Sequence, residues 1–298
     1  MLKVVIADTW SESETVKIPD KFKGYFPKAR FYTHTIGGPY TKKPHTHGFQ
    51  VASRMLLPLI DTDVEVHLVR YLDRATTSGD NALFKLIKEI KPHVWNNSWT
   101  QPRLKNLDGA QKSAWSDWIC AEAEMRKELG YILVFAAGNS DTNGLSYYDV
   151  GYPQRLIKDA IIVGAHNKQG IMAYFSSDGN VTCSALGHYV YTWNPETEKW
   201  EVSSGTSFSA PNTAGLIGYL ISKDASFDYK KAIEWIKLKA TIPVNYPVDK
   251  LPNPKFGWGS IAGEYMKVTK EKDAYNKVEM PKSTNNKSLV WMDFCKVE

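Results

Sequence analysis

The chain has 298 residues, of which 43% are hydrophobic and 23% are charged. This composition is typical of a folded globular protein and excludes a disordered or fibrous chain. A net charge of +5, from 37 basic against 32 acidic residues, is too small an excess to indicate a nucleic-acid-binding protein. The 3 cysteines include no closely spaced pair, which argues against a disulfide framework or a zinc module and favours a reducing compartment.

Short apolar stretches alternate along the chain with segments of helical periodicity, and this alternation predicts an α/β fold. The predicted strands are residues 3–7, 64–71, 94–98, 131–137 and 160–165. The predicted helices are residues 49–57, 81–90, 112–129, 207–222 and 229–240, and a hairpin is expected at residues 189–193 and 199–203. The strands are almost continuously apolar, as expected of a mostly parallel central sheet with helices on both faces.

Residues 1–266 are expected to form one domain, and the lysine-rich residues 267–298 an extension packed on it. The basic residues between 21 and 30 are interpreted as solvated surface. No apolar run approaches the roughly 20 residues of a membrane span, so no membrane partner is expected.

Four polar residues lie at the predicted ends of elements, where open α/β sheets carry their functional groups. Asp8 ends the first strand, His47 begins a helix, Asn139 follows a strand, and Ser207 begins a long apolar helix. A serine hydroxyl becomes a strong nucleophile when a neutral histidine takes its proton, and a carboxylate then orients that histidine. The Asn139 amide and the Ser207 backbone N–H are suitable donors to a developing oxyanion.

Each of these residues alone is typical of a cap or a turn, whereas the four together, in this order, are not. The surrounding motifs resemble those of the subtilase family of serine peptidases, at residues 5–9, 46–52, 136–139 and 205–211. The resemblance covers about residues 3–262 and implies a subtilisin-like three-layer fold. It also implies a serine endopeptidase with an Asp8/His47/Ser207 triad and Asn139 in the oxyanion hole.

The same resemblance implies how substrate would bind. The substrate would add as a strand along Ser98, Trp99 and Thr100, with a pocket near Ala137, Gly138 and Gly151. Because the residues at this pocket are small and none is acidic, a large apolar substrate side chain is expected.

The chain departs from the family pattern at several positions. Trp10 stands where glycine is usual, Phe49 and Gln50 replace Thr-His, Trp99 and Thr100 replace a flexible edge, and Asn212 replaces a frequent histidine. None of these departures removes a proton-transfer or oxyanion group. They are therefore interpreted as changes of specificity.

The absence of room for a signal or propeptide before Asp8 leads to the expectation of a cytoplasmic or virus-borne protein, or of a mature fragment. No cofactor is predicted; Asp61, Asp63 and Glu65 could bind calcium but are expected to be exposed surface acids. His45 and His47 lack further ligands for a metal site. The expected partner is a protein or peptide substrate, and a regulatory inhibitor or an assembly partner is left open.

Two other functions compete with an endopeptidase. The first is a binding or structural protein on a peptidase scaffold, which usually lacks a triad member. The second is an esterase of the α/β-hydrolase class, which needs Gly-x-Ser-x-Gly and the order Ser, Asp, His. Here the order is Asp8, His47, Ser207, and Ser209 occupies the position of the second glycine.

Overall fold

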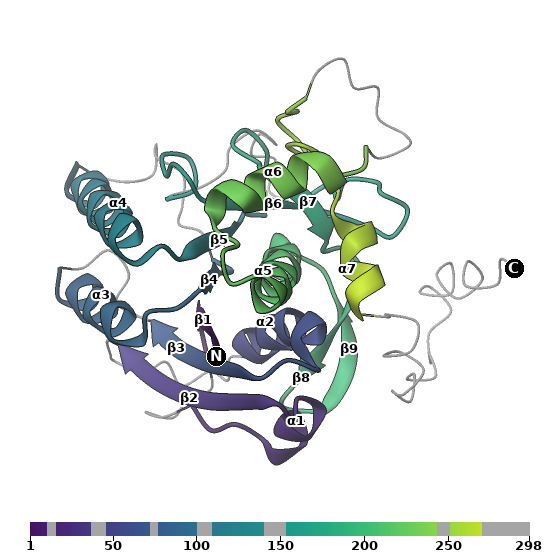
Figure 1. The fold of residues 1–298 in the computed structure, drawn as a ribbon, viewed down its shortest axis with the longest axis horizontal. Coiled ribbons are helices and arrows are strands. Elements are labelled where there is room, and N and C mark those ends of the chain that lie inside the picture. Colours follow the sequence, from purple (N-terminus) through teal and green to yellow (C-terminus); the bar gives the residue numbers. More distant parts are fainter. Residues whose placement is uncertain are drawn as a thin grey trace, which may run out of the picture.

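The computed structural model describes residues 1–10, 16–36, 46–71, 77–99, 109–139, 153–242 and 251–269. Seven strands form one parallel sheet in the order β2-β3-β1-β4-β5-β6-β7 (Figure 1). They are β1 (Leu2–Asp8), β2 (Ala29–Ile36), β3 (Val64–Tyr71), β4 (Val94–Asn97), β5 (Ile132–Ala136), β6 (Ile161–His166) and β7 (Cys183–Leu186). The predicted α/β fold with a mostly parallel sheet is confirmed.

Helices lie on both faces of this sheet (Figure 1). They are α1 (Asp20–Tyr25), α2 (His47–Leu56), α3 (Thr77–Ile90), α4 (Gly109–Leu129), α5 (Thr206–Lys223), α6 (Tyr229–Lys239) and α7 (Ala262–Thr269), with a short 3-10 helix η1 (Leu57–Leu59). Alternate residues of β1 pack into two separate cores, as the strand period of two requires. Val4 and Ile6 face α2 and α5, whereas Val5 and Ala7 face α3 and α4.

The strand order changes direction at β1, and this position determines where a site can form. From β1 the chain first forms the edge strand β2 and then β3, which lies between β2 and β1, and it then crosses to the other side of β1 to form β4. Ligands in open α/β sheets bind in the crevice at the carboxyl ends of the strands beside such a switch point. Asp8 ends β1, and Ser98 directly follows β4.

The predicted hairpin is present as β8 (Val190–Asn194) and β9 (Lys199–Ser203), which pair antiparallel. The sequence patterns did not predict α1, β2, β7 or α7. β2 is an edge strand with mostly exposed or half-buried residues, β7 has 4 residues, and α1 has 6, so their apolar patterns are weak. The basic residues between 21 and 30 are exposed, as interpreted from the sequence, and part of β2 lies in this range.

The predicted domain boundary between residues 266 and 267 falls within α7. Residues 270–298 lie outside the described part of the chain, so the predicted extension stays a prediction. Within the described residues, no helix combines the length and apolar character needed to span a membrane.

Candidate active site

Asp8 and His47 meet at the carboxyl end of β1. His47 is the first residue of α2, and its Nδ1 lies 2.7 Å from Asp8 Oδ1. The backbone N–H of Thr9 donates to the same oxygen over 2.7 Å and fixes the carboxylate. Because a carboxylate only accepts hydrogen bonds, Nδ1 carries the imidazole proton and Nε2 is the basic nitrogen. The Asp8 side chain is 2% exposed and that of His47 is 35% exposed.

The start of α2 packs tightly against the loop that follows β1. The Gly48 N–H donates to Thr9 O over 3.0 Å, and a Cβ at Gly48 would lie 2.5 Å from that oxygen. The Trp10 indole is fully buried, donates to Val69 O over 3.1 Å and packs edge-to-face on Phe49 with ring centroids 5.2 Å apart. Two of the departures from the family pattern, Trp10 and Phe49, thus contact one another and stabilise the turn beside His47.

Ser207 lies in the first turn of α5, where a backbone N–H has no acceptor within the helix. The ring of the next residue, Phe208, lies 5.9 Å from the His47 ring, so His47 is close to this helix end. Pro211 lacks an N–H, so the Ser207 carbonyl loses its usual helical donor four residues later. The Ser98 hydroxyl donates to this carbonyl instead, over 2.9 Å, and the Ser207 hydroxyl donates to Ser98 O over 3.2 Å.

Asn139 follows β5, and its side-chain amide has a defined orientation. Its Oδ1 accepts hydrogen bonds from the backbone N–H and the hydroxyl of Thr206, both at 3.0 Å. The N–H can only donate, so the atom facing it must be the oxygen, and the amide nitrogen is left for another acceptor. Gly138 has φ +105°, a conformation that favours glycine, and its N–H donates to the Thr206 hydroxyl over 3.1 Å.

The residues expected to bind substrate are only partly described. Ser98 contacts Ser207 as above, and Trp99 is 7% exposed and packs among the aromatic rings beneath α4. Ala137 is fully buried, and Thr100 and Gly151 lie outside the described residues. The expectation of a large apolar substrate side chain therefore stays a prediction.

Two residues that support this region are not predicted by the sequence patterns. Thr206 orients Asn139. Its position beside Ser207 in the motif is a signal that could have suggested this role. The Gln154 amide donates to Trp99 O over 2.8 Å and to Ala136 O over 3.0 Å, and so joins the segment after β4 to the end of β5. No local pattern marks Gln154, because the two carbonyl groups that it contacts are distant in the sequence.

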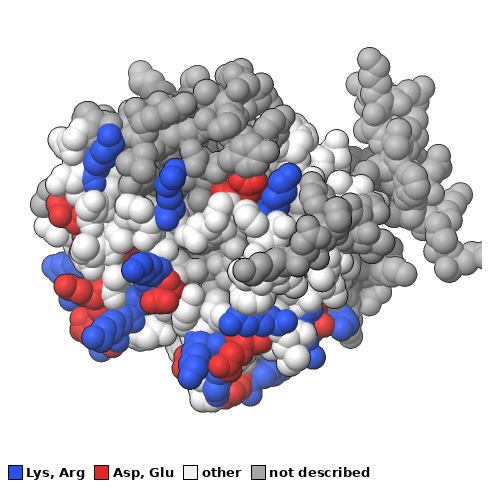
Figure 2. Space-filling view, turned by 90° about the horizontal axis from the view of Figure 1, so that it is seen from above, with Lys and Arg blue, Asp and Glu red and all other residues white. Residues whose placement is uncertain are grey.

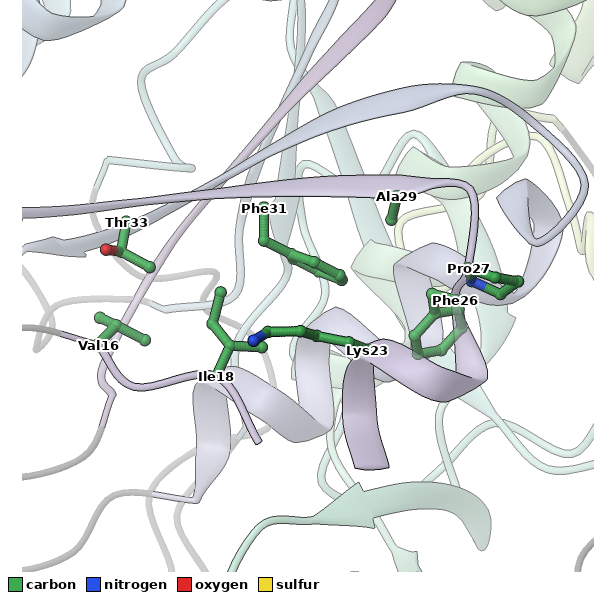
Figure 3. Close-up of a pocket in the computed structure, with 8 residues that line it drawn as sticks. All are labelled: Val16, Ile18, Lys23, Phe26, Pro27, Ala29, Phe31 and Thr33. Atoms are coloured by element: carbon green, nitrogen blue, oxygen red, sulfur yellow. The ribbon is translucent and has the colours of Figure 1, made fainter. Parts of the chain in front are cut away.

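A pocket of about 420 Å³ lies apart from these residues, between residues 16–18, α1 and the edge strand β2 (Figure 3). Most of the residues that line it are apolar, and the Lys23 chain runs along one side: Val16, Ile18, Lys23, Phe26, Pro27, Ala29, Phe31 and Thr33. The face seen in Figure 2 carries basic and acidic side chains intermixed. In the described ranges, no three His, Cys, Asp or Glu side chains lie close enough to hold a metal ion.

Comparison with known proteins identifies the family. The model of the subtilase family matches residues 3–259. The chain belongs to the subtilase family. It is 33% identical over 161 residues to the subtilisin-like serine protease pepC of Aspergillus niger, covering 52% of this chain and 27% of that protein. It is 32% identical over 120 residues to alkaline protease 2 of Aspergillus fumigatus, covering 39% of this chain and 23% of that protein.

Solved structures of the same fold align over almost the whole subtilase chain. A lanthipeptide protease has a TM-score of 0.67 at 18% identity, covering 91% of this chain and 88% of that one. The self-cleaved protease domain of PatA has a TM-score of 0.61 at 18% identity, covering 90% of this chain and 97% of that one. The subtilisin-like fold implied by the sequence motifs is therefore confirmed.

Proposed function

We propose that this subtilase is a serine endopeptidase that hydrolyses peptide bonds through an acyl-enzyme on Ser207. The observation that carries the proposal is the 2.7 Å contact between His47 Nδ1 and Asp8 Oδ1 beside the first turn of α5. This contact selects the histidine tautomer whose Nε2 can take a proton, and Asp8 stabilises the imidazolium that results. The membership of the chain in a family with named serine proteases supports the same activity.

The reaction then follows from the roles of the residues. Ser207 Oγ bonds to the substrate carbonyl carbon while His47 Nε2 takes the hydroxyl proton, and the carbonyl oxygen becomes an oxyanion. The Asn139 amide and the Ser207 N–H donate to that oxyanion. Collapse breaks the C–N bond, and His47 returns the proton to the leaving amine. Water repeats the sequence on the acyl-enzyme, releasing the carboxylic acid and restoring Ser207.

A fluorophosphonate probe tests this proposal directly, because it reacts with activated serine hydroxyls. The wild type should be labelled, and labelling should be lost in Ser207→Ala and His47→Ala. Ser204→Ala is a matched control three residues earlier in the same segment and should still be labelled. If the folded wild type is not labelled, the peptidase proposal fails and a binding protein on a peptidase scaffold becomes the better explanation.

Further expectations about partners belong to this proposal. The substrate is a protein or peptide, and the rate should increase with pH as His47 loses its proton. The absence of a cofactor remains an expectation from the sequence.

A further inference from the structure

The helix that begins with His47 and the helix that carries Ser207 are joined by a buried polar contact, which we call the Arg54–Asn212 bridge. Arg54 lies in α2 and Asn212 in α5, and Arg54 Nε donates to Asn212 Oδ1 over 2.9 Å. Arg54 is 0% and Asn212 1% exposed. Burying a guanidinium costs free energy unless hydrogen bonds around it compensate. A movement of either helix that broke this contact would therefore be unfavourable.

The bridge is anchored to the structure around it. Arg54 Nη1 donates to Tyr191 O in β8 over 3.1 Å, and the guanidinium lies 5.2 Å from the centre of the Tyr265 ring in α7. The Asn212 amide nitrogen donates to Leu186 O, at the end of β7, over 2.8 Å. Because a guanidinium is planar with donors in fixed directions, these contacts define the position of α2 against α5 and the strands.

The bridge lies within a short distance along each helix of the residues proposed to react. Arg54 is two helical turns after His47, and Asn212 follows Ser207 by about one and a half turns. A displacement of α2 along α5 would therefore move the imidazole of His47 relative to the hydroxyl of Ser207. An error of about 1 Å in such an arrangement can reduce a rate by about 100-fold.

We propose that the Arg54–Asn212 bridge positions His47 against Ser207, an inference that rests on the proposed endopeptidase function. Arg54 and Asn212 are positioning residues, since neither reaches the reacting atoms. Asn212 departs from the family pattern, and from the sequence this departure is interpreted as a change of specificity. In the proposed bridge, Asn212 instead accepts a hydrogen bond that joins two helices.

Steady-state kinetics of three variants test the proposal well below their melting temperatures. Arg54→Lys keeps the charge but cannot reproduce the two directed contacts, and Asn212→Leu removes the acceptor. Asn212→Asp keeps the acceptor oxygen for Arg54 but loses the N–H that donates to Leu186 O, so it should restore activity only in part. We expect kcat to be about 10- to 100-fold lower in the first two variants, with KM little changed. The two effects should be less than additive in the double variant, because both substitutions break the contact between Arg54 and Asn212.

The control is Tyr131→Phe, which removes another buried hydrogen bond, to Glu122 Oε1 at 2.8 Å, in the core on the other face of the sheet from α2 and α5. It should lower the melting temperature without changing kcat. Folded Arg54→Lys or Asn212→Leu enzyme with a wild-type kcat would overturn the proposal, as would additive effects. If Arg54→Lys does not fold, the kcat values of Asn212→Leu and Asn212→Asp still test the proposal.

A second readout does not depend on turnover. The Nδ1 proton of His47, hydrogen-bonded to Asp8, should give a downfield proton NMR signal. We expect this signal to shift or broaden in Asn212→Leu and to keep its wild-type position in Tyr131→Phe. A wild type that fails to react with the fluorophosphonate probe would remove the peptidase function, whereas an unchanged His47 signal in Asn212→Leu would remove the positioning role.

Discussion

The orientation of the Asn139 amide depends on Thr206, whose backbone N–H and hydroxyl both donate to Asn139 Oδ1 at 3.0 Å. Asn139→Asp keeps this acceptor but removes the donor that faces the proposed oxyanion. We expect kcat to fall by about 100- to 1,000-fold in Asn139→Asp and Asn139→Ala, because one oxyanion donor is lost. Peptide hydrolysis at saturating substrate measures this effect.

Thr206→Val is the matched control at the neighbouring position. It keeps the Thr206 N–H and the shape of the side chain, and it removes only the hydroxyl. Its kcat should fall less than that of Asn139→Asp, because one of the two donors to Oδ1 remains. Equal losses in the two variants would mean that orientation by Thr206, and not the amide donor itself, determines the rate.

At the scale of elements, the edge strand β2 is joined to β3 by a pair of histidines. His34 Nε2 lies 3.0 Å from His67 Nδ1. Burial lowers the pKa of His67 from its ordinary value of 6.5 to about 4, and the charges of His34 and Lys3 act in the same direction. Burial also lowers the pKa of His34, with Glu89 of α3 acting in the opposite direction. Glu65 Oε2 lies 3.9 Å from His67 Nε2 and is the nearby acidic group on β3.

This depressed pKa predicts that the protein loses stability in acid. Between pH 6.5 and about 4, the unfolded chain binds a proton at His67 that the folded chain does not. Stability is therefore complete above the unfolded pKa and decreases as the pH falls through this window. Melting temperatures measured from pH 7 to pH 4.5 should fall, and the slope should be smaller in His67→Gln.

His188→Gln provides the comparison, since burial lowers the pKa of this less buried histidine as well. It should change the slope less than His67→Gln does. A His67→Gln slope as steep as that of the wild type would show that other groups cause the acid sensitivity.

At the scale of the whole molecule, local patterns predicted what short segments can show. Apolar runs predicted β1, β3, β4, β5 and β6, and the motifs singled out Asp8 and His47, which the structure brings together. The contacts that complete the site join residues far apart in sequence. Ser98 and Ser207 are 109 residues apart, and Arg54 and Asn212 are 158 apart. No pattern within a short window of the sequence indicates such pairs. Only the structure shows the hydrogen bond of the Ser98 hydroxyl, the contacts of Gln154 and the Arg54–Asn212 bridge.

The same long-range packing brings α2 and α5 so close that one position between them requires glycine. A Cβ at Gly215 of α5 would overlap the carbonyl oxygen of Met55 in α2 and lie 3.0 Å from Pro58 Cγ. The Met55 backbone cannot move aside as the end of a flexible side chain could. We expect Gly215→Ala to reduce the free energy of unfolding by about 1–3 kcal/mol or more, as overpacking does.

Gly218, one helical turn further along α5, is the matched control for this substitution. A Cβ there would meet Leu2 Cδ2 at 3.4 Å and Leu59 Cδ1 at 3.5 Å, which are ordinary contacts. Gly218→Ala should be neutral or stabilising by up to about 1 kcal/mol, because alanine favours a helix interior. Urea unfolding of both variants makes the comparison, and equal stabilities would contradict the close approach of the two helices. Because these helices carry His47 and Ser207, Gly215→Ala should also slow the reaction with the fluorophosphonate probe, whereas Gly218→Ala should not.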